Sequence, residues 1–354
     1  MEEVKIAILG LNQGYKFAKD ALDMPGVKLV AVAGNDKLSE QRARELNVPL
    51  YKDYKQLLEE CELDGVIIAL PNGLHREATE LAASKKLHVL VEKPIAPTIE
   101  DGEAMIKACK EHNVKMLVGH HRRFSSKLVK LKEVISTGVI GDLVGVNMFY
   151  MIAKDRPYFA EKWRLTEGGG PILINGIHDI DTLRFLTGLT INSVYAAIRN
   201  SIRNNPVEDS ASVIMETEEG PIVNYFLSDG VPSPWSYDLN AKENKKFSHF
   251  DDDCYKFFGT KGSLAFPSMN FYYYEDNQFG WEHPLKVKTF EIDENDPMTD
   301  ELKHFIEMLR NDDVKPLVTG EDALETLRVT MAIKKSAKHS QKVLVQEDKI
   351  AIAK

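Results

Sequence analysis

Short hydrophobic runs alternate with amphipathic segments along the first third of the chain. Five runs, rich in Val, Ile and Leu, have the length and continuity of strands buried on both faces. They lie at Val4–Leu9, Val27–Ala33, Gly65–Ala69, His88–Val91 and Lys115–Val118. Segments with helical spacing separate them, at Tyr15–Met24, Ser39–Leu46, Asp53–Cys61, His75–Ser84 and Thr98–His112. This alternation predicts a parallel α/β sheet with right-handed crossovers, whose ligand lies at the carboxyl ends of the strands.

The pattern changes at about Phe124, after which strand-like runs dominate. These runs lie at Leu143–Met151, Ile191–Ile198, Ser212–Glu216 and Ile222–Leu227. We therefore predict two domains, a nucleotide-binding domain over 1–122 and a second domain over 123–354. The length of 354 residues also favours about two domains over one core.

Composition narrows the class of protein. With 43% hydrophobic and 28% charged residues, the chain has the make-up of a globular protein, and a net charge of −9 argues against a broad nucleic-acid surface. The three cysteines form no CxxC pair, which favours a reducing compartment and predicts neither disulfides nor a zinc knuckle. The N-terminal sequence lacks a signal peptide pattern, and no apolar run is long enough to span a membrane. We expect a cytoplasmic protein.

The first strand leads into a glycine-containing loop, GLNQGYKFA. Gly10 fits the first place of the G-x-G-x-x-G dinucleotide pattern, Asn12 takes the second, and Gly14 is one residue out of register. Such a loop brings a pyrophosphate to a helix N-terminus. A nucleotide loop and a plain strand–helix turn are equally compatible with this incomplete pattern.

The end of the second strand bears on cofactor choice. NAD-specific sites usually have an acid here for the ribose hydroxyls, but Gly34 stands at that place, and Asp36 lies further along. Asn35 and Lys37 suit a 2′-phosphate, although a solvated turn explains them equally well. NAD and NADP both stay open, and we expect Gly34→Asp to shift the preference toward NAD.

Two later loops, ALPNGLH and EKPIA, also follow predicted strands and so lie at the ligand edge of the sheet. Lys93 stands between a glutamate and a proline at the end of a buried strand. Partial desolvation there lowers a lysine pKa and allows proton exchange near neutrality. The residues of these loops that we expect to contact the cofactor are Leu70, Pro71, Asn72, His75, Glu92 and Lys93.

The stretch GGGPILINGIHDID, from Gly168 to Asp181, precedes a predicted helix that stops at Gly188. The glycines allow close approach to another backbone or to a nicotinamide ring. His178 and Asp181 are three residues apart and share a helix face. From the pattern alone, a polar helix cap is the preferred interpretation of His178, with catalysis as the alternative.

Taken together, these motifs resemble the Gfo/Idh/MocA family of glucose–fructose oxidoreductase and inositol dehydrogenase. The matching pieces are the Gly10 loop, Ala69–Asn72, Glu92–Pro94, Gly119–Phe124 and Gly168–Asp181. The resemblance implies a Rossmann domain, a C-terminal α/β domain with a large, mostly antiparallel sheet, and NAD(P)-dependent oxidoreduction of a sugar, inositol or related polyhydroxy compound. It also implies a homodimer or homotetramer that is joined through the C-terminal sheet.

The resemblance further implies that Lys93 and His178, which can both face an interdomain cleft, are the catalytic pair for proton transfer. Arg122 then lies near the substrate. The family pattern has an aspartate four residues before the histidine, where this chain has Ile174. Because isoleucine cannot orient an imidazole, Asp181 or another acid serves His178, or the proton chemistry differs.

Four further polar or aromatic side chains of the second domain suit a polyhydroxylated substrate. They are Trp163, Arg164, Asn175 and Asp181. Trp235 is compatible with either a sugar contact or ordinary packing. We expect no metal site, since His120 and His121 point apart on an extended chain and HFDDDCY (249–255) has the character of a solvated acidic loop.

Two other functions stay open. One is a regulatory protein that binds nucleotide and ligand without turnover, which the incomplete glycine pattern and Ile174 support. The other is a glycoside-cleaving enzyme that uses NAD transiently. The presence of both Lys93 and His178 favours catalysis, because a binding protein has no need of that pair.

Overall fold

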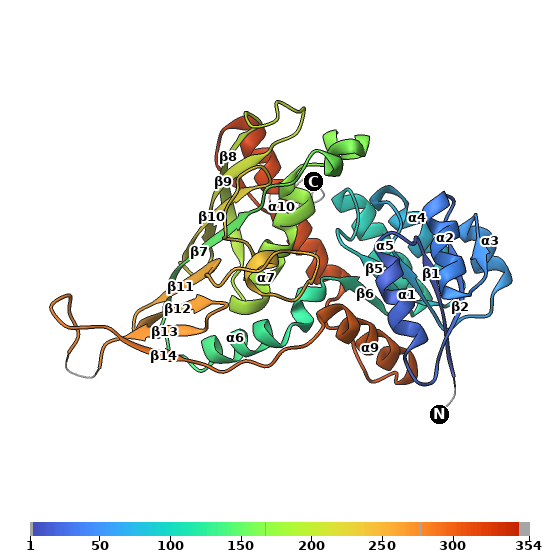
Figure 1. Cartoon of the computed structure of the whole chain (residues 1–354), viewed down its shortest axis with the longest axis horizontal. Helices are drawn as coiled ribbons and strands as arrows, with labels where there is room; N and C mark the ends of the chain where they lie inside the picture. Colours follow the sequence, from blue (N-terminus) through green and yellow to red (C-terminus); the bar gives the residue numbers. More distant parts are fainter. Residues whose placement is uncertain (1–2, 167, 276–277, 347–354) are drawn as a thin grey trace. The chain divides into compact units, whose positions relative to one another are not determined.

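The structure is a computed structural model that describes residues 3–166, 168–275 and 278–346. The chain divides into two compact units (Figure 1). Unit 1 comprises the described parts of 1–124 together with 296–327, and unit 2 comprises 125–295 and the described residues from 328 onward. The chain therefore first passes from unit 1 to unit 2 after residue 124, two residues beyond the predicted boundary at 122.

Unit 1 is built on a six-stranded, wholly parallel sheet of order β3-β2-β1-β4-β5-β6. Its strands are β1 Val4–Leu9, β2 Val27–Ala33, β3 Leu50–Tyr51, β4 Gly65–Ile68, β5 His88–Glu92 and β6 Met116–Gly119. The five predicted strands are confirmed to within a residue or so at their ends. Only β3 was missed, because two half-buried residues carry no hydrophobic run.

The helices of unit 1 also follow the predicted pattern. They are α1 Gly14–Leu22, α2 Lys37–Leu46, α3 Tyr54–Glu60, α4 His75–Ser84 and α5 Ile99–His112, with short 3₁₀ helices η1 Asn72–Leu74 and η2 His121–Phe124. Asp36, Asp53 and Thr98 cap α2, α3 and α5 by accepting backbone N–H groups. The side chain of Gln13, the N-cap residue of α1, makes no capping hydrogen bond.

Unit 1 also contains a segment that the sequence analysis assigned to the second domain. Helix α9, Pro297–Arg310, packs against α1 and β1, and the long helix α10, Gly320–His339, begins in the same unit. Leu302 and Phe305 of α9 are completely buried. The predicted extent of the second domain, 123–354, is therefore wrong for 296–327. The change of hydrophobic period near residue 124 marks where the chain leaves the first unit, but it does not show that the chain comes back to that unit later.

Unit 2 contains a nine-stranded sheet of order β14-β13-β12-β11-β7-β10-β9-β8-β15. Its strands are β7 Leu143–Met151, β8 Ile191–Arg199, β9 Ser210–Thr217, β10 Ile222–Ser228, β11 Tyr255–Gly259, β12 Gly262–Phe266, β13 Asn270–Tyr273, β14 Lys286–Thr289 and β15 Val343–Leu344. All described neighbours are antiparallel except β7 and β10, which run parallel. The expected large, mostly antiparallel sheet is confirmed.

Helices cover one face of this sheet, as Figure 1 shows for α6 Ser126–Ser136, α7 Ile177–Thr187 and α10. Their apolar residues and the inward residues of the strands form one core. The opposite face keeps large apolar side chains exposed by 37–58%. These are Val144, Tyr195, Ile214, Ile222 and Phe226. The alternation of buried and exposed positions along β8, β9 and β10 produces this two-sided sheet.

Candidate active site

The loop after β1 has the geometry that a dinucleotide requires. Gly10 has φ +91°, and a Cβ there would lie 2.3 Å from the carbonyl oxygen of Ala69. A Cβ at Gly14 would lie 2.6 Å from Ile8. Both glycines are thus needed for close packing despite the shifted pattern. The first turn of α1 has no acidic residue and no side-chain cap, so its N–H groups suit a pyrophosphate.

A residue that sequence reasoning missed holds this loop. Arg42 of α2 donates hydrogen bonds from Nη1 to the carbonyl oxygens of Leu11 and Asn12. Its guanidinium also lies 4.7 Å from the ring centroid of Tyr15. The exposed Asn12 is therefore fixed through its backbone. An arginine in a polar helix gives no sequence signal for such a contact.

The end of β2 corrects one expectation about cofactor choice. Asp36 is the N-cap of α2 and accepts a hydrogen bond from the backbone N–H of Ser39, which lowers the pKa of its carboxyl group. A Cβ at Gly34 would lie 2.4 Å from Ser39 Oγ, so the expected Gly34→Asp substitution displaces the capping turn as well. Asn35 is exposed and is the better position for such a test.

His75 joins the loops that follow β4 and β5. Its Nε2 lies 2.9 Å from the carbonyl oxygen of Leu70, and its Nδ1 lies 3.1 Å from that of Pro94 and 3.2 Å from that of Ile95. The side chain is completely buried, and burial lowers its pKa. We expected His75 to contact the cofactor directly. In the structure, its ring instead holds the two loops together through their carbonyl oxygens.

The neighbouring residues of these loops lie at the carboxyl ends of β4 and β5. Pro71 is exposed, and Leu70 and Asn72 are half-buried. Lys93, also half-buried, precedes Pro94 through a cis peptide bond and donates its backbone N–H to Glu92 Oε2 at 3.2 Å. Burial raises the pKa of the Glu92 carboxyl group.

The GHHRRF segment forms the end of β6 and the 3₁₀ helix η2, and is not extended as we assumed for His120 and His121. Burial, with the nearby charges of Arg122 and Lys93, lowers the pKa of His121 to about 3. Arg123 pairs with Asp322. Arg122 is only 3% exposed, so it offers little surface to a substrate in this conformation.

In unit 2, each glycine of GGGP accommodates a neighbouring group. Gly168 has φ +90°, and a Cβ at Gly169 would lie 2.6 Å from the backbone of Arg164. A Cβ at Gly170 would lie 2.1 Å from the carboxylate of Glu208, which accepts a 3.1 Å hydrogen bond from the backbone N–H of Ile172. Close approach to another backbone is thus confirmed for Gly169, whereas Gly170 makes room for a side-chain carboxylate and Gly168 allows the positive φ.

The helix that carries His178 begins earlier than the sequence indicates. A π-helical turn, η5 Ile172–Gly176, runs directly into α7, and Pro171 and Gly176 both have helical backbone angles. His178 therefore lies inside a continuous helical segment. The interpretation of His178 as a helix cap is wrong.

Three polar residues at the start of α7 are buried. His178 is 8% exposed, Asp181 is 1% exposed and Asp179 is completely buried. Asp179, which sequence reasoning passed over, accepts hydrogen bonds from the hydroxyls of Tyr225 and Tyr255 and thus fixes α7 to β10 and β11. The burial of Asp181 conflicts with the substrate contact that we expected and indicates a supporting role inside the unit.

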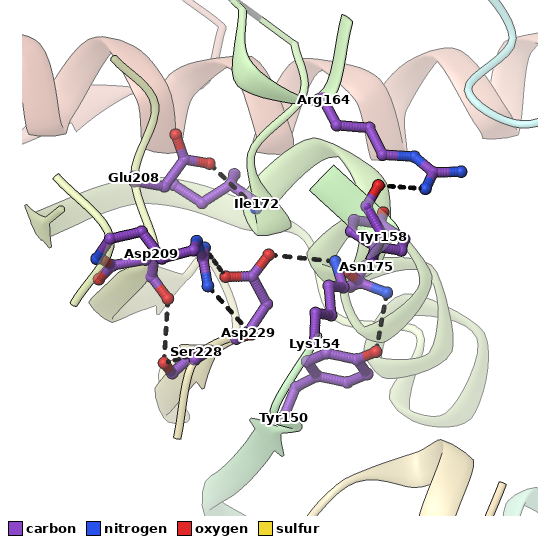
Figure 2. Close-up of polar contacts among 12 residues, drawn as sticks. Tyr150, Lys154, Tyr158, Arg164, Ile172, Asn175, Glu208, Asp209, Ser228 and Asp229 are labelled. Atoms are coloured by element: carbon purple, nitrogen blue, oxygen red, sulfur yellow. Dashed lines mark hydrogen bonds and ion pairs between the residues drawn. The ribbon is translucent and has the colours of Figure 1, made fainter. Parts of the chain in front are cut away.

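Asn175 belongs to a polar network that Figure 2 shows. Its Oδ1 accepts a 2.7 Å hydrogen bond from Lys154 Nζ, and its Nδ2 donates to Tyr150 Oη at 2.8 Å. Lys154 Nζ also lies 3.2 Å from Asp229 Oδ2. The lysine was missed, since a single lysine after a strand looks like an ordinary solvated charge.

The aromatic candidates and the acidic loop have clear placements. Trp163 is 51% exposed, and the guanidinium of Arg164 lies 5.3 Å from its ring. Trp235 is 41% exposed and donates from Nε1 to Asp252 at 2.9 Å. Asp251 pairs with Lys242, so HFDDDCY takes part in local contacts.

Across the described residues, no cluster of three or more His, Cys, Asp or Glu side chains has the geometry of a metal site. Likewise, no helix within the described ranges is both long and apolar enough to cross a membrane.

Comparisons with known proteins match both halves of the chain. Residues 4–120 match the model of the oxidoreductase family with an NAD-binding Rossmann fold, and residues 128–265 match the C-terminal domain model of the same family, GFO/IDH/MocA. A scyllo-inositol 2-dehydrogenase (NAD⁺) of Bacillus subtilis is 30% identical over 96% of this chain and 96% of its own. A myo-inositol 2-dehydrogenase of Thermotoga maritima is 25% identical over 97% and 99%.

The fold agrees with a solved structure of similar extent. The scyllo-inositol dehydrogenase of Lactobacillus casei, solved with NAD(H) and scyllo-inositol, gives a TM-score of 0.76 at 23% identity, covering 97% of this chain and 99% of that one. The glycine loop, the EKP loop and the two matched domains lead to one conclusion: the chain belongs to the Gfo/Idh/MocA family of NAD(P)-dependent oxidoreductases.

Proposed function

We propose that this protein is a dehydrogenase or reductase that transfers a hydride between NAD(P) and a CH–OH group of a sugar, inositol or related polyhydroxy compound. The observation that carries the proposal is the ligand edge of unit 1. There, the uncapped start of α1, the Gly10 loop and the EKP loop follow strands that end at one side of the parallel sheet. The inositol dehydrogenases among its relatives support the substrate class.

The residues of unit 1 divide into groups by what they offer a dinucleotide. The backbone of the Gly10 loop and the first turn of α1 bind the pyrophosphate, while Arg42 keeps that loop in place. When bound, NAD(P) supplies the hydride acceptor or donor. Asn35 would contact the ribose, and Leu70, Pro71, Asn72 and Glu92 would line the approach to the nicotinamide, while His75 holds their loops together.

Proton transfer falls to Lys93 and His178. In oxidation, one of them accepts the proton of the substrate hydroxyl as the hydride leaves the carbon, and in reduction it returns that proton. Asp179 anchors the helix of His178 through two tyrosine hydroxyls, so the imidazole is presented from a rigid element. This anchoring compensates in part for Ile174, which stands where the family has an aspartate.

A nicotinamide absorbance screen tests this function. Sugars, inositols and sugar acids are offered to the full-length protein with NAD, NADP or their reduced forms, and we expect turnover of at least one class. Saturable cofactor binding in calorimetry serves as the parallel measurement. Binding without any turnover would favour the regulatory protein, and hydrolysis of a glycoside without net change in NAD would favour the glycoside-cleaving enzyme.

We expect Asn35→Asp to shift the ratio of kcat/KM values toward NAD. A carboxylate at this exposed position accepts hydrogen bonds from ribose hydroxyls and repels a 2′-phosphate, whereas the wild-type strand end has its only acid engaged as the α2 cap. A shift of roughly 10-fold corresponds to about 1.4 kcal/mol. Asn35→Ser is the uncharged control. An unchanged ratio would show that the ribose lies elsewhere.

We also propose that the exposed face of the unit 2 sheet joins copies of the chain as a homodimer or homotetramer. The support is the row of apolar side chains on adjacent strands, since exposed apolar patches of this kind mark interaction sites. Sedimentation of the wild type and of Phe226→Asp measures the association. A monomeric wild type contradicts the proposal.

A cytoplasmic location is proposed from the cysteines. Cys61, Cys109 and Cys254 form no disulfide with one another, as a reducing compartment allows. Fractionation of cells that express the protein checks this location.

A further inference from the structure

Three cationic side chains of unit 2 are linked through a buried carboxylate and a tyrosine ring. They are Lys154, Arg164 and Arg203, and we refer to them as the basic cluster. Lys154 Nζ lies 3.2 Å from Asp229 Oδ2, and Arg203 pairs with Asp229 Oδ1. The side chain of Asp229 is 1% exposed, that of Lys154 9% and that of Arg203 17%. One carboxylate is thus shared between two cations that water scarcely reaches.

Arg164 adds a third cation without adding a carboxylate. Its Nη1 donates to the carbonyl oxygen of Tyr158, as Figure 2 shows, and its Nε is buried with no hydrogen-bond partner among the described residues. Its guanidinium lies 3.9 Å from the centroid of the Tyr158 ring, and Lys154 Nζ lies 4.6 Å from the same centroid. One tyrosine ring thus brings the two cations together.

Three further carboxylates lie nearby and accept hydrogen bonds from neutral donors. Asp238 accepts from the hydroxyl of Tyr150 at 3.0 Å. Asp209 accepts from the backbone N–H groups of Ile202 and Arg203, and Glu208 accepts from the backbone N–H of Ile172. Burial also raises the pKa of the Glu208 carboxyl group, which favours its neutral form. These neutral donors leave the charges of Asp209 and Asp238 in place. Arg164 differs from Lys154 and Arg203 because it forms no ion pair with a carboxylate of the described residues, and a buried polar atom without a partner is costly.

The basic cluster is connected to the segment that carries the candidate proton-transfer residue. Lys154 donates to Asn175, which lies in the π-helical turn that leads into α7 and His178. Burial lowers the pKa of the Lys154 ammonium group, against the attraction of Asp229. A bound anion opposes that shift and favours the charged lysine.

From this arrangement we infer that the basic cluster binds a carboxylate of the substrate, so that the polyhydroxy substrate is a sugar acid. Lysine and arginine offer only donors, whereas a neutral polyol also needs acceptors. The planar guanidinium of Arg164 matches a carboxylate in a bidentate arrangement. This inference rests on the proposed oxidoreductase function and specifies its substrate.

The experiment compares matched pairs of substrates on the full-length protein with NAD and with NADP. Each pair is a neutral sugar and the uronic acid of the same stereochemistry, with the sugar 6-phosphate as a third member. We expect the acid to have the highest kcat/KM and its KM to rise with ionic strength. A preference for the neutral sugar or for the phosphate overturns the inference.

Arg164→Gln tests the cluster itself. We expect it to raise the KM for the acid by about 10–100-fold, as the loss of a charge-assisted contact implies, and to raise the KM for the neutral sugar much less. Arg156→Gln, an exposed arginine of the same segment, is the matched control. Equal effects of Arg164→Gln on the acid and on the neutral sugar would assign Arg164 a structural role and overturn the inference.

A failure of the proposed function is separable from a failure of this inference. If no substrate is turned over, calorimetry of the same uronic acids with the cofactor-saturated protein measures carboxylate binding directly. Binding that Arg164→Gln weakens supports the basic cluster even without catalysis, and absence of binding to every acid overturns it. Circular dichroism of each variant establishes that it is folded.

Discussion

Replacing His178 by alanine is expected to lower kcat by about 10²–10⁴-fold, the usual contribution of a positioned acid or base. Lys93→Ala is expected to have an effect of the same order, with the Kd of the cofactor largely unchanged for His178→Ala. Under the proposal that both groups serve the same proton transfer, the double variant should lose less than the product of the two single losses. Steady-state kinetics with the best substrate of the screen measures all three.

The control for this prediction is His283→Ala, which removes an exposed histidine of the same unit. Thermal denaturation of each variant separates a loss of chemistry from a loss of structure. Full activity in His178→Ala would leave that histidine only a packing role in α7. Independent, multiplicative losses would mean that the two residues act in different steps.

Asp179→Ala is expected to reduce the free energy of unfolding of unit 2 by about 2–6 kcal/mol, because it leaves two buried tyrosine hydroxyls without their acceptor, at about 1–3 kcal/mol each. Calorimetry that resolves the transitions of the two units measures the loss. Tyr255→Phe removes one donor and should cost less. Asp293→Ala, at an exposed aspartate of the same unit, is the control.

The same variant also distinguishes two roles of an acid beside His178. If Asp179 fixes the helix, activity should recover under conditions that restore folding, such as lower temperature. A normal unfolding transition combined with lost activity would contradict this anchoring role and assign Asp179 to the chemistry of the imidazole.

Local patterns predicted the elements of unit 1 well, because strands buried on both faces produce continuous apolar runs and the helices between them produce a regular period. The same patterns missed α9 as a part of unit 1, since packing against α1 and β1 is a long-range event without a local signature. Lys16 is an example of both kinds of contact. It pairs with Asp20 one helical turn away, and its Nζ also lies 2.9 Å from Oδ2 of Asp296, which is distant in the sequence.

The site residues divide in the same way. Gly10 was predicted from its place in the dinucleotide pattern and Gly14 in spite of its shifted place, and the structure explains both by close contacts. Arg42, Lys154 and Asp179 were missed, because their importance depends on burial and on partners from other elements. His75 was predicted to contact the cofactor because it follows ALPNGL in a loop at the ligand edge. In the structure its ring holds two loops together inside the unit.

The division of unit 1 between two stretches of chain affects how the protein is made. A ribosome that has finished residue 124 has produced the six parallel strands but not α9, whose Leu302, Phe305 and Met308 are completely buried in the finished protein. Burying a large apolar side chain typically contributes about 1.5–3 kcal/mol. The nucleotide-binding half therefore waits through the synthesis of about the next 170 residues, those of unit 2, before it is complete. A fragment cut at residue 122 lacks this helix, so the smallest piece that retains a complete first unit must join 1–124 to 296–327 by a new linker.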